Sequence, residues 1–440
     1  MDAKMSQRTQ GRKPRIVIAG GGFAGAYTAK HLKSAIHQFD ADVLLLDRNN
    51  YFIFYPLLVE AGTGSLEPRH AIVPIRQFLN RSSRFRMAET LGVDLEKKQV
   101  VYRIIGESEE QRADYDHLVL AIGSVTRLPP IPGLAEHCYE MKSLADSVGL
   151  RDRAIQMLEL ANVTKDEAKR RALLHFVVVG SNFTGIEVAG EFQEYMREAA
   201  RVFRNIKPED CQLTVVERAD RILTVLDEDL SKFAHDALVK RGVKIRVKTS
   251  VKELKADEVI LDNGEVLAAH TLVWCGGVKE NPLAAKLPFP LDARGYIECE
   301  RDLRVKGFDN VWAVGDCAAI KDEEGRLYAP TAQNALRMGK ICAQNITRSL
   351  RGERLKPCNL VNQGSLAALG CRTAVAKIFG VKVSGILAWW MWRTVYLLKM
   401  PTLARKIRVA ADWTVDLFFQ RDFSQLGVHR SAVVASRPKY

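Results

Sequence analysis

Residues 15–32 read RIVIAGGGFAGAYTAKHL, a pattern typical of a buried strand, a glycine-rich turn and a helix. Gly20, Gly22 and Gly25 fit G-x-G-x-x-G, in which the glycines allow a tight turn, close approach of a pyrophosphate and helix-on-strand packing. The helix N-terminus then faces the phosphates. A second strand, ADVLLLD, ends at Asp47, whose carboxylate suits a ribose hydroxyl. The segment therefore predicts a dinucleotide-binding fold.

A second cycle of the same kind begins at residue 175. The strand HFVVVG ends at Gly180, the loop SNFTG leads into a helix, and a further strand, QLTVVE, ends at Glu217. Gly180 and Gly185 are in place, but Asn182 stands where the middle glycine is expected, and we expect its side chain to crowd a pyrophosphate. Glu217 favours an unphosphorylated ribose, hence NADH over NADPH. The alternative is a duplicated domain that no longer binds nucleotide.

The charge of the chain is uneven. Its 440 residues include 65 Lys or Arg and 52 Asp or Glu, a net charge of +13, which favours an anionic partner. From Lys377 to Tyr440 there are 11 basic and three acidic residues, together with four of the six tryptophans. Basic residues among aromatic ones predict an amphipathic anchor on an anionic membrane surface. A nucleic-acid surface fits the apolar run GILAWWMW poorly, and a helix packed on the chain's own core or on a dimer mate is the structural alternative.

Targeting signals and metal motifs are not apparent. The first residues lack the apolar core of a secretory signal, so residues 1–12 are interpreted as a disordered leader. The eight cysteines are scattered without a CxxC, which predicts reduced thiols and no metal site. The longest apolar stretch, Val383–Met400, is interrupted by Arg393 and Lys399, so a membrane span is disfavoured.

Several further motifs complete a family pattern. They are YFIFYPLLVEAGTGSLEP (51–68), YDHLVLAIGS (115–124), VWAVGDCA (311–318), PTAQNALRMGK (330–340) and GSLAALG (364–370). With the two glycine loops, this set resembles the type II NADH:quinone oxidoreductases, or alternative NADH dehydrogenases, over residues 13–425. Disulfide reductases of the same superfamily carry a cysteine pair after the first glycine loop, and this chain has no cysteine before Cys138.

The resemblance implies an α/β protein with two Rossmann-like dinucleotide-binding domains, one for FAD and one for NADH, and a C-terminal amphipathic helical membrane-anchoring region. We expect residues 13–135 plus 285–375 to form the FAD-binding domain, 136–284 the NADH-binding domain and 376–440 the anchoring region.

The resemblance also implies the cofactor-binding residues. For FAD they are Gly20, Gly22, Phe23, Ala24, Gly25, Asp47, Arg48, Ala121, Gly123, Gly315, Asp316 and Gln333. For NADH they are Gly180, Asn182, Phe183, Thr184, Gly185, Glu187, Glu217, Gly276 and Gly277.

Three residues are the implied catalytic candidates. Glu187, in the T-G-x-E position, is expected at the junction of nicotinamide and flavin; a stabilising role at the helix N-terminus is compatible. Gln333 matches the first glutamine of an A-Q-x-x-x-Q motif beside the quinone, whereas Arg337 replaces the second. Gln363 stands where many members carry lysine. These departures leave the electron acceptor less well defined than the NADH half of the reaction.

The implied function is non-pumping NADH:quinone oxidation: hydride from NADH to FAD, then two electrons to a membrane quinone. The implied location is peripheral, on the cytoplasmic face of a bacterial inner membrane or on an organelle's inner membrane. A homodimer is common among such enzymes. Two alternatives remain: a sulfide:quinone oxidoreductase, for which Cys138 and Cys358 lie in suitable regions, and a low-turnover NADH-binding flavoprotein with a signalling role.

Overall fold

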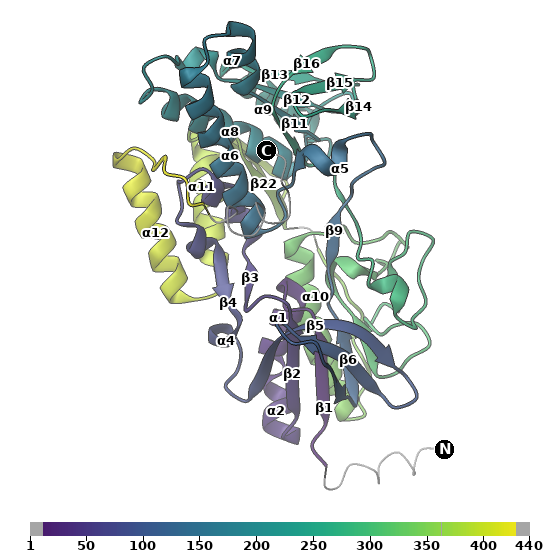
Figure 1. The fold of residues 1–440 in the computed structure, drawn as a ribbon. Coiled ribbons are helices and arrows are strands. Elements are labelled where there is room, and N and C mark those ends of the chain that lie inside the picture. The colour runs from purple at the N-terminus through teal and green to yellow at the C-terminus, as the bar shows by residue number, and fades with distance from the viewer. Residues whose placement is uncertain (1–11, 362, 428–440) are drawn as a thin grey trace. The chain divides into compact units, whose positions relative to one another are not determined.

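The computed structural model describes residues 12–361 and 363–427. The expected leader lies almost wholly outside the described residues, as does the end of the expected anchoring region, 428–440. The chain divides into two compact units (Figure 1). Unit 1 comprises residues 1–53, 73–125 and 279–361, and unit 2 comprises 54–72, 126–278 and 362–440. Each unit contains one of the two expected glycine loops.

Unit 1 is built on a seven-stranded sheet with the order β20-β8-β1-β2-β5-β6-β7. Its strands are β1 (Arg15–Ala19), β2 (Asp42–Asp47), β5 (Ser83–Asp94), β6 (Gln99–Ile104), β7 (Glu110–Asp114), β8 (His117–Leu120) and β20 (Val311–Ala313). The pairs from β20 to β5 are parallel, and β5, β6 and β7 pair antiparallel. The parallel strands β1 and β8 are almost fully buried, as their unbroken apolar runs predict.

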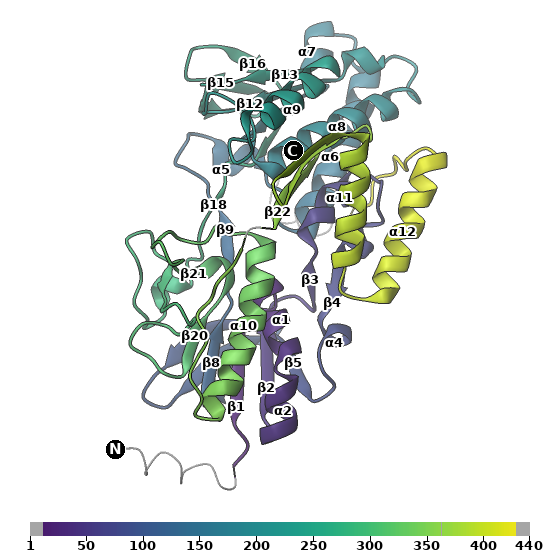
Figure 2. The same ribbon diagram turned by 180° about the vertical axis from the view of Figure 1, so that it is seen from behind.

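The sheet of unit 1 is accompanied by the helices α1 (Phe23–His31), α2 (Lys33–Phe39) and α10 (Ala332–Leu350). Helices α1 and α10 pack against each other (Figure 2). Gly339 of α10 permits this contact, because a Cβ there would lie 2.4 Å from the carbonyl oxygen of Ala24. The core of the unit includes Val17, Leu44 and Leu118.

Unit 2 contains a five-stranded parallel sheet with the order β10-β17-β11-β12-β13. Its strands are β10 (Cys138–Tyr139), β11 (His175–Val179), β12 (Gln212–Val216), β13 (Val243–Arg246) and β17 (Thr271–Trp274). An antiparallel sheet of β14 (Val251–Leu254), β15 (Glu258–Leu261) and β16 (Val266–Ala268) contributes to the same core. The helices of this part are α5 (Leu134–His137), α6 (Leu144–Val163), α7 (Glu167–Leu173), α8 (Phe183–Ala200) and α9 (Glu228–Lys240).

The C-terminal part of unit 2 forms three antiparallel strands followed by two helices (Figure 2). They are β22 (Gly364–Ala368), β23 (Ala374–Ile378), β24 (Val381–Gly385), α11 (Ile386–Lys399) and α12 (Leu403–Phe418). Gly190 of α8 packs on the turn after β22, where a Cβ would lie 2.0 Å from the carbonyl oxygen of Leu369. The short helix α3 (Leu58–Gly62) also packs against α8 and α6.

The structure confirms the expected fold class, with two Rossmann-type sheets, one mixed and one parallel, and C-terminal helices. The stretch from Val381 is divided between β24 and the 14-residue α11. Within 12–361 and 363–427, no helix is both long enough and apolar enough to cross a membrane. The compact units differ from the expected cofactor domains at 54–72, 126–135 and 363–375, which group with unit 2, and at 279–284, which group with unit 1.

Candidate functional site

The first glycine loop connects β1 to α1 in unit 1. Gly20 has φ +106°, and a Cβ there would lie 2.2 Å from the carbonyl oxygen of Ala121. A Cβ at Gly25 would lie 1.8 Å from the carbonyl oxygen of Gly20, so both positions require glycine for packing. A Cβ at Gly22 would meet no protein atom within 4 Å. Packing therefore does not demand glycine at 22, and the space beside this backbone is free of protein atoms.

Asp47 closes this loop from the end of β2. Its carboxylate accepts hydrogen bonds from Gly21 N at 2.6 Å and from Asn49 N at 2.7 Å. Burial raises the pKa of Asp47, and these two backbone donors partly offset that effect. Arg48 is exposed and lies 3.9 Å from Glu89. Backbone N–H groups on both sides thus hold Asp47 at the end of β2, where it is expected to contact FAD.

The remaining expected FAD residues also lie in unit 1. Phe23 and Ala24 are buried in the first turn of α1, and Ala121 N donates to Ala19 O at 2.8 Å. Asp316 accepts a 2.9 Å hydrogen bond from Ser124 Oγ, which follows Gly123, and Gly315 has φ +76°. The ends of β8 and β20, which are paired strands, therefore place the GD motif beside the segment 121–124.

The second glycine loop, between β11 and α8 in unit 2, repeats this geometry. Gly180 N donates to Val216 O at 2.9 Å, as Gly20 N does to Leu46 O at 2.8 Å. A Cβ at Gly185 would lie 1.9 Å from the carbonyl oxygen of Gly180. Phe183 and Thr184 form the first turn of α8. The departure at Asn182 has therefore not changed the path of the backbone.

Asn182 is the N-cap of α8. Its Oδ1 accepts from Gly185 N at 3.0 Å, and its Nδ2 donates to Cys275 O at 2.8 Å. The corresponding residue of the first loop, Gly22, provides no side-chain cap. Asn182 thus holds its side chain on its own loop, whereas the sequence alone suggested a group projecting toward a phosphate. The backbone N–H groups of Phe183 and Thr184 are not engaged by this cap.

We expect Asn182→Ala to lower the free energy of unfolding by about 1 kcal/mol, because the alanine removes the cap. Asn182→Gly should cost only a few tenths of a kcal/mol, since glycine is itself tolerated at N-caps. Urea unfolding of the two variants beside the parent protein measures the difference. Equal stability of the alanine variant and the parent would show that the cap contributes nothing.

Glu217 occupies in unit 2 the position that Asp47 has in unit 1. Its carboxylate accepts hydrogen bonds from Ser181 N at 2.7 Å, Ser181 Oγ at 2.6 Å and Ala219 N at 2.8 Å. Gly276 lies against the indole of Trp274, where a Cβ would be 2.5 Å from the ring. Gly277 has φ +98°. The expected NADH residues of the loop 180–185, together with Glu217, Gly276 and Gly277, thus lie at the carboxyl ends of β11, β12 and β17.

The catalytic candidates divide between the units. Glu187 is half-buried in α8 of unit 2 and accepts a 3.3 Å hydrogen bond from Ala368 N. Burial raises its pKa to about 8, and the like charges of Glu60 and Glu191 add to this. Gln333 and Arg337 lie one turn apart on α10 of unit 1. Arg337 Nη1 donates to Val361 O at 2.6 Å, so this guanidinium binds the backbone of the last residue of unit 1.

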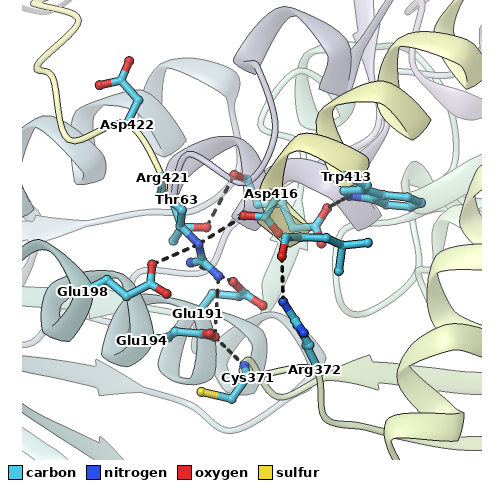
Figure 3. Close-up of polar contacts among 12 residues, drawn as sticks. Thr63, Glu191, Glu194, Glu198, Cys371, Arg372, Trp413, Asp416, Arg421 and Asp422 are labelled. Atoms are coloured by element: carbon cyan, nitrogen blue, oxygen red, sulfur yellow. Dashed lines mark hydrogen bonds and ion pairs between the residues drawn. The ribbon is translucent and has the colours of Figure 1, made fainter. Parts of the chain in front are cut away.

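Unit 2 also contains a buried ionic cluster that the sequence analysis missed (Figure 3). Its centre is Arg421, whose side chain is 9% exposed. Its guanidinium lies 3.4 Å from Glu191 and 3.5 Å from each of Glu194, Glu198 and Asp416. Three of these carboxylates lie on α8 at intervals of three and four residues, which places them on one helix face. That spacing was the one signal available in the sequence.

Arg393 is the second cation of this region. It is 5% exposed, lies 3.2 Å from Asp416, and its guanidinium carbon lies 4.1 Å from the ring centre of Trp389 and 4.9 Å from that of Trp413. Aromatic faces stabilise a guanidinium that has left water. Arg393 was expected only to interrupt an apolar stretch; it is instead part of the core between α11 and α12.

The thiols show no sign of activation. Burial raises the pKa of Cys138 to about 11 and that of Cys358 to about 12. Because the thiolate is the reactive form, such thiols are poor nucleophiles at neutral pH. No group of three or more His, Cys, Asp or Glu in the described part of the chain is arranged to hold a metal ion.

Comparison with known proteins agrees with this geometry. The family model for pyridine nucleotide-disulphide oxidoreductases matches residues 14–339, and the model for the NDH2 C-terminal domain matches residues 362–422. A demethylphylloquinone reductase from Synechocystis is 30% identical over 407 residues, covering 91% of this chain and 96% of its own. The type II NADH:quinone oxidoreductase of Mycobacterium tuberculosis is 30% identical over 425 residues, covering 93% and 89%.

Among solved structures, NDH2 from Plasmodium falciparum in complex with NADH is similar with a TM-score of 0.87 and 20% identity, covering 94% of this chain and all of the other. At that identity, the likeness concerns the fold. The two glycine loops and the matched models define the class: the chain is a pyridine nucleotide-disulphide oxidoreductase. Within that class it belongs to the type II NADH:quinone oxidoreductase family.

Proposed function

We propose that the chain oxidises NADH and reduces a membrane quinone, with FAD as its resident cofactor. The observation that carries the proposal is the pair of matching glycine loops, each closed by an acid at the end of the following strand. Two such loops suit two dinucleotides, one resident and one exchanging. When bound, FAD supplies the hydride-accepting and electron-donating chemistry that the side chains lack.

In unit 1 the residues present fit FAD. The open position at Gly22 and the first turn of α1 suit its pyrophosphate, and Asp47 suits the adenosine ribose. Asp316, held by Ser124, suits the ribityl hydroxyls by analogy with the GD motif of the family. The proposed FAD-binding domain is residues 13–135 plus 285–375, as expected from the sequence, and most of these residues belong to unit 1.

In unit 2 the loop 180–185 and Glu217 suit NADH. The N–H groups at the first turn of α8 favour a pyrophosphate. Glu217 suits the ribose hydroxyls and repels a 2′-phosphate, so NADH is the proposed donor. Glu187, Gln333 and Arg337 are the proposed residues at the reacting end: Glu187 to hold a proton, Gln333 and Arg337 to orient the quinone carbonyl oxygens.

The deciding experiment is steady-state oxidation of NADH and of NADPH by the detergent-solubilised protein with a short-chain quinone. We expect quinone-dependent turnover with NADH. Flavin bleaching by sulfide but not by NADH, in the absence of oxygen, would instead establish the sulfide alternative. Fast flavin reduction by NADH without reoxidation by quinone would support the signalling alternative.

The surface of α11 and α12 supports a membrane-bound location. Large apolar side chains are exposed on α11 at Ile386, Leu387, Trp390 and Leu398, and on α12 at Leu403, Ile407, Val415 and Phe418. In each helix they fall on one face. Part of the basic charge of this region is not available to a membrane surface. Arg393 and Arg421 are buried, and Lys377 and Lys382 form ion pairs with Asp227. The apolar stripe therefore contributes more to the proposed anchoring than the charge count suggested.

We propose that these helices lie on an anionic membrane surface, at the cytoplasmic face of a bacterial inner membrane or on an organelle's inner membrane. A quinone dissolves in lipid, so this location brings enzyme and acceptor together. A homodimer joined through the same face is the competing arrangement.

We expect the double variant Leu403→Glu plus Ile407→Glu to bind anionic vesicles at least about tenfold more weakly, because each buried leucine or isoleucine contributes about 1.5–3 kcal/mol. Co-sedimentation with vesicles measures it. Val163→Glu, which is equally exposed at the end of α6, is the matched control and should bind as the parent does. Unchanged binding of the double variant would argue against this face.

A further inference from the structure

Glu60 is a buried carboxyl group to which the proposed function assigns no part. It lies in α3, is 5% exposed, and its Oε2 accepts a 2.7 Å hydrogen bond from Trp413 Nε1 of α12. Burial raises its pKa to about 7, against the opposing effects of Arg393 and Trp413. An acid of this kind changes charge near neutral pH.

Glu60 lies on α3, which packs against α8, the helix that carries Glu187. Its hydrogen-bond donor Trp413 has its ring centre 6.1 Å from that of Trp392 on α11. The charge of Glu60 is one cause of the raised pKa of Glu187, and Glu191 acts in the same direction. Like charges at close range in a poorly solvated region disfavour simultaneous ionisation. A negative charge on Glu60 therefore favours the protonated form of Glu187.

The surroundings contain more acids than bases. The carboxyl groups are Glu60 on α3, Glu187, Glu191, Glu194 and Glu198 on α8, and Asp416 on α12; the cations are Arg393 on α11, Arg421 after α12 and Arg151 on α6; the phenols are Tyr195 on α8 and Tyr396 on α11. The two arginines at the centre, Arg393 and Arg421, already bind Asp416 and three glutamates of α8. Little positive charge remains to hold Glu60 and Glu187 ionised together.

We propose that Glu60 is a positioning residue that keeps a proton on Glu187 at neutral pH. The inference rests on the proposed function. NADH, one proton and quinone give NAD⁺ and quinol: NADH supplies two electrons and one hydrogen, and the second proton comes from the carboxyl group of Glu187. Water then returns a proton to Glu187. Glu60 does not touch the reacting atoms; its negative charge makes the protonated form of Glu187 the stable one.

The test is the pH dependence of kcat for NADH oxidation by a soluble quinone, in the full-length FAD-loaded protein. In Glu60→Gln, the pH at which kcat declines on the alkaline side should fall by about half to one unit, because one neighbouring negative charge is gone. Glu60→Asp keeps the charge and should restore the parent profile. Glu67→Gln removes the same charge from an exposed position in the same segment and should leave the profile unchanged. A parent-like alkaline limit in Glu60→Gln would overturn the inference.

Infrared titration of the protonated carboxyl band, without NADH or quinone, provides a readout independent of turnover. Glu60→Gln should remove one carboxyl group that titrates near neutrality and lower the titration midpoint of the remaining carboxyl groups. An unchanged midpoint would overturn the inference.

If Glu60→Gln does not fold, Trp413→Phe serves instead. Loss of the indole donor keeps Glu60 neutral to higher pH, so Glu187 loses its proton at lower pH. The pH at which kcat declines on the alkaline side should therefore fall again. Absence of quinone-dependent turnover in the parent would refute the proposed function alone, because the infrared titration still decides the role of Glu60.

Discussion

Arg421→Met is expected to lower the free energy of unfolding by roughly 3 kcal/mol, the size associated with removing one partner of a buried ion pair. The guanidinium lies within 3.5 Å of four carboxylates and is almost fully buried (Figure 3). Methionine fills similar volume but leaves these acids without their shared cation. The burial of Glu191 already raises its pKa even though Arg421 opposes the effect. Without Arg421, more of these groups must bind protons or take up water.

The pH dependence of this variant gives a second, signed expectation. Glutamates with a raised pKa in the folded protein stabilise it below their unfolded pKa, and this contribution is lost as the pH rises through the folded value. Glu60 and Glu187 titrate at about 7 and 8. The stability of the parent should therefore fall from about pH 5 to about pH 8, and that of Arg421→Met should fall more steeply, by about 1.4 kcal/mol per pH unit for each further proton retained in the folded state.

Urea unfolding at pH 6, 7 and 8 measures both effects. Arg171→Met is the matched control, because Arg171 forms an exposed ion pair with Glu167 within α7. Such pairs contribute about 0–1 kcal/mol, so the control should stay close to the parent at every pH. A loss below 1 kcal/mol in Arg421→Met would mean that the cluster is solvated rather than buried.

The glycine loops were predictable because every contact that shapes them is local or lies between adjacent strands. Gly20, Gly25 and Asp47 occur within one strand–helix–strand cycle, and the same holds for Gly180, Gly185 and Glu217. The hydrogen bonds of Asn182 were harder to predict, because its acceptor Cys275 lies 93 residues further along the chain. The residue type shows that Asn182 can cap a helix N-terminus, but not whether its side chain points to its own loop or toward a bound phosphate.

The ionic cluster could not be predicted for a different reason. Glu60 contacts Trp413 across 353 residues of sequence, and Glu191 contacts Arg421 across 230. In the sequence, Arg393 and Arg421 counted as two more positive charges in a basic tail. Composition counts charges but not their partners, so the tail appeared more available to an anionic surface than its contacts allow.

Glu217→Gln is expected to shift the preference of the enzyme from NADH toward NADPH. The ratio of kcat/KM for NADH to kcat/KM for NADPH should fall by about 100-fold, equivalent to about 2.7 kcal/mol. The amide retains an acceptor for Ser181 N, so the loop should stay in place. It loses the charge that strengthens hydrogen bonds from the ribose hydroxyls of NADH, by about 1.5–3 kcal/mol. It also removes the repulsion of a 2′-phosphate, which favours NADPH. Both changes move the ratio in the same direction.

The measurement is kcat/KM for NADH and for NADPH with one quinone held at a fixed concentration. Glu209→Gln is the control, because Glu209 is exposed and precedes the N-terminal end of β12, whereas Glu217 follows its C-terminal end. The NADH-to-NADPH ratio of kcat/KM in this variant should match that of the parent. Glu217→Asp retains the charge but shortens the reach, so NADH turnover should weaken while NADPH stays disfavoured. An unchanged ratio in Glu217→Gln would place the nucleotide ribose elsewhere and remove the basis for assigning NADH to unit 2. A shift confined to Glu217 would tie donor choice to the one carboxylate that Ser181 holds at the end of β12.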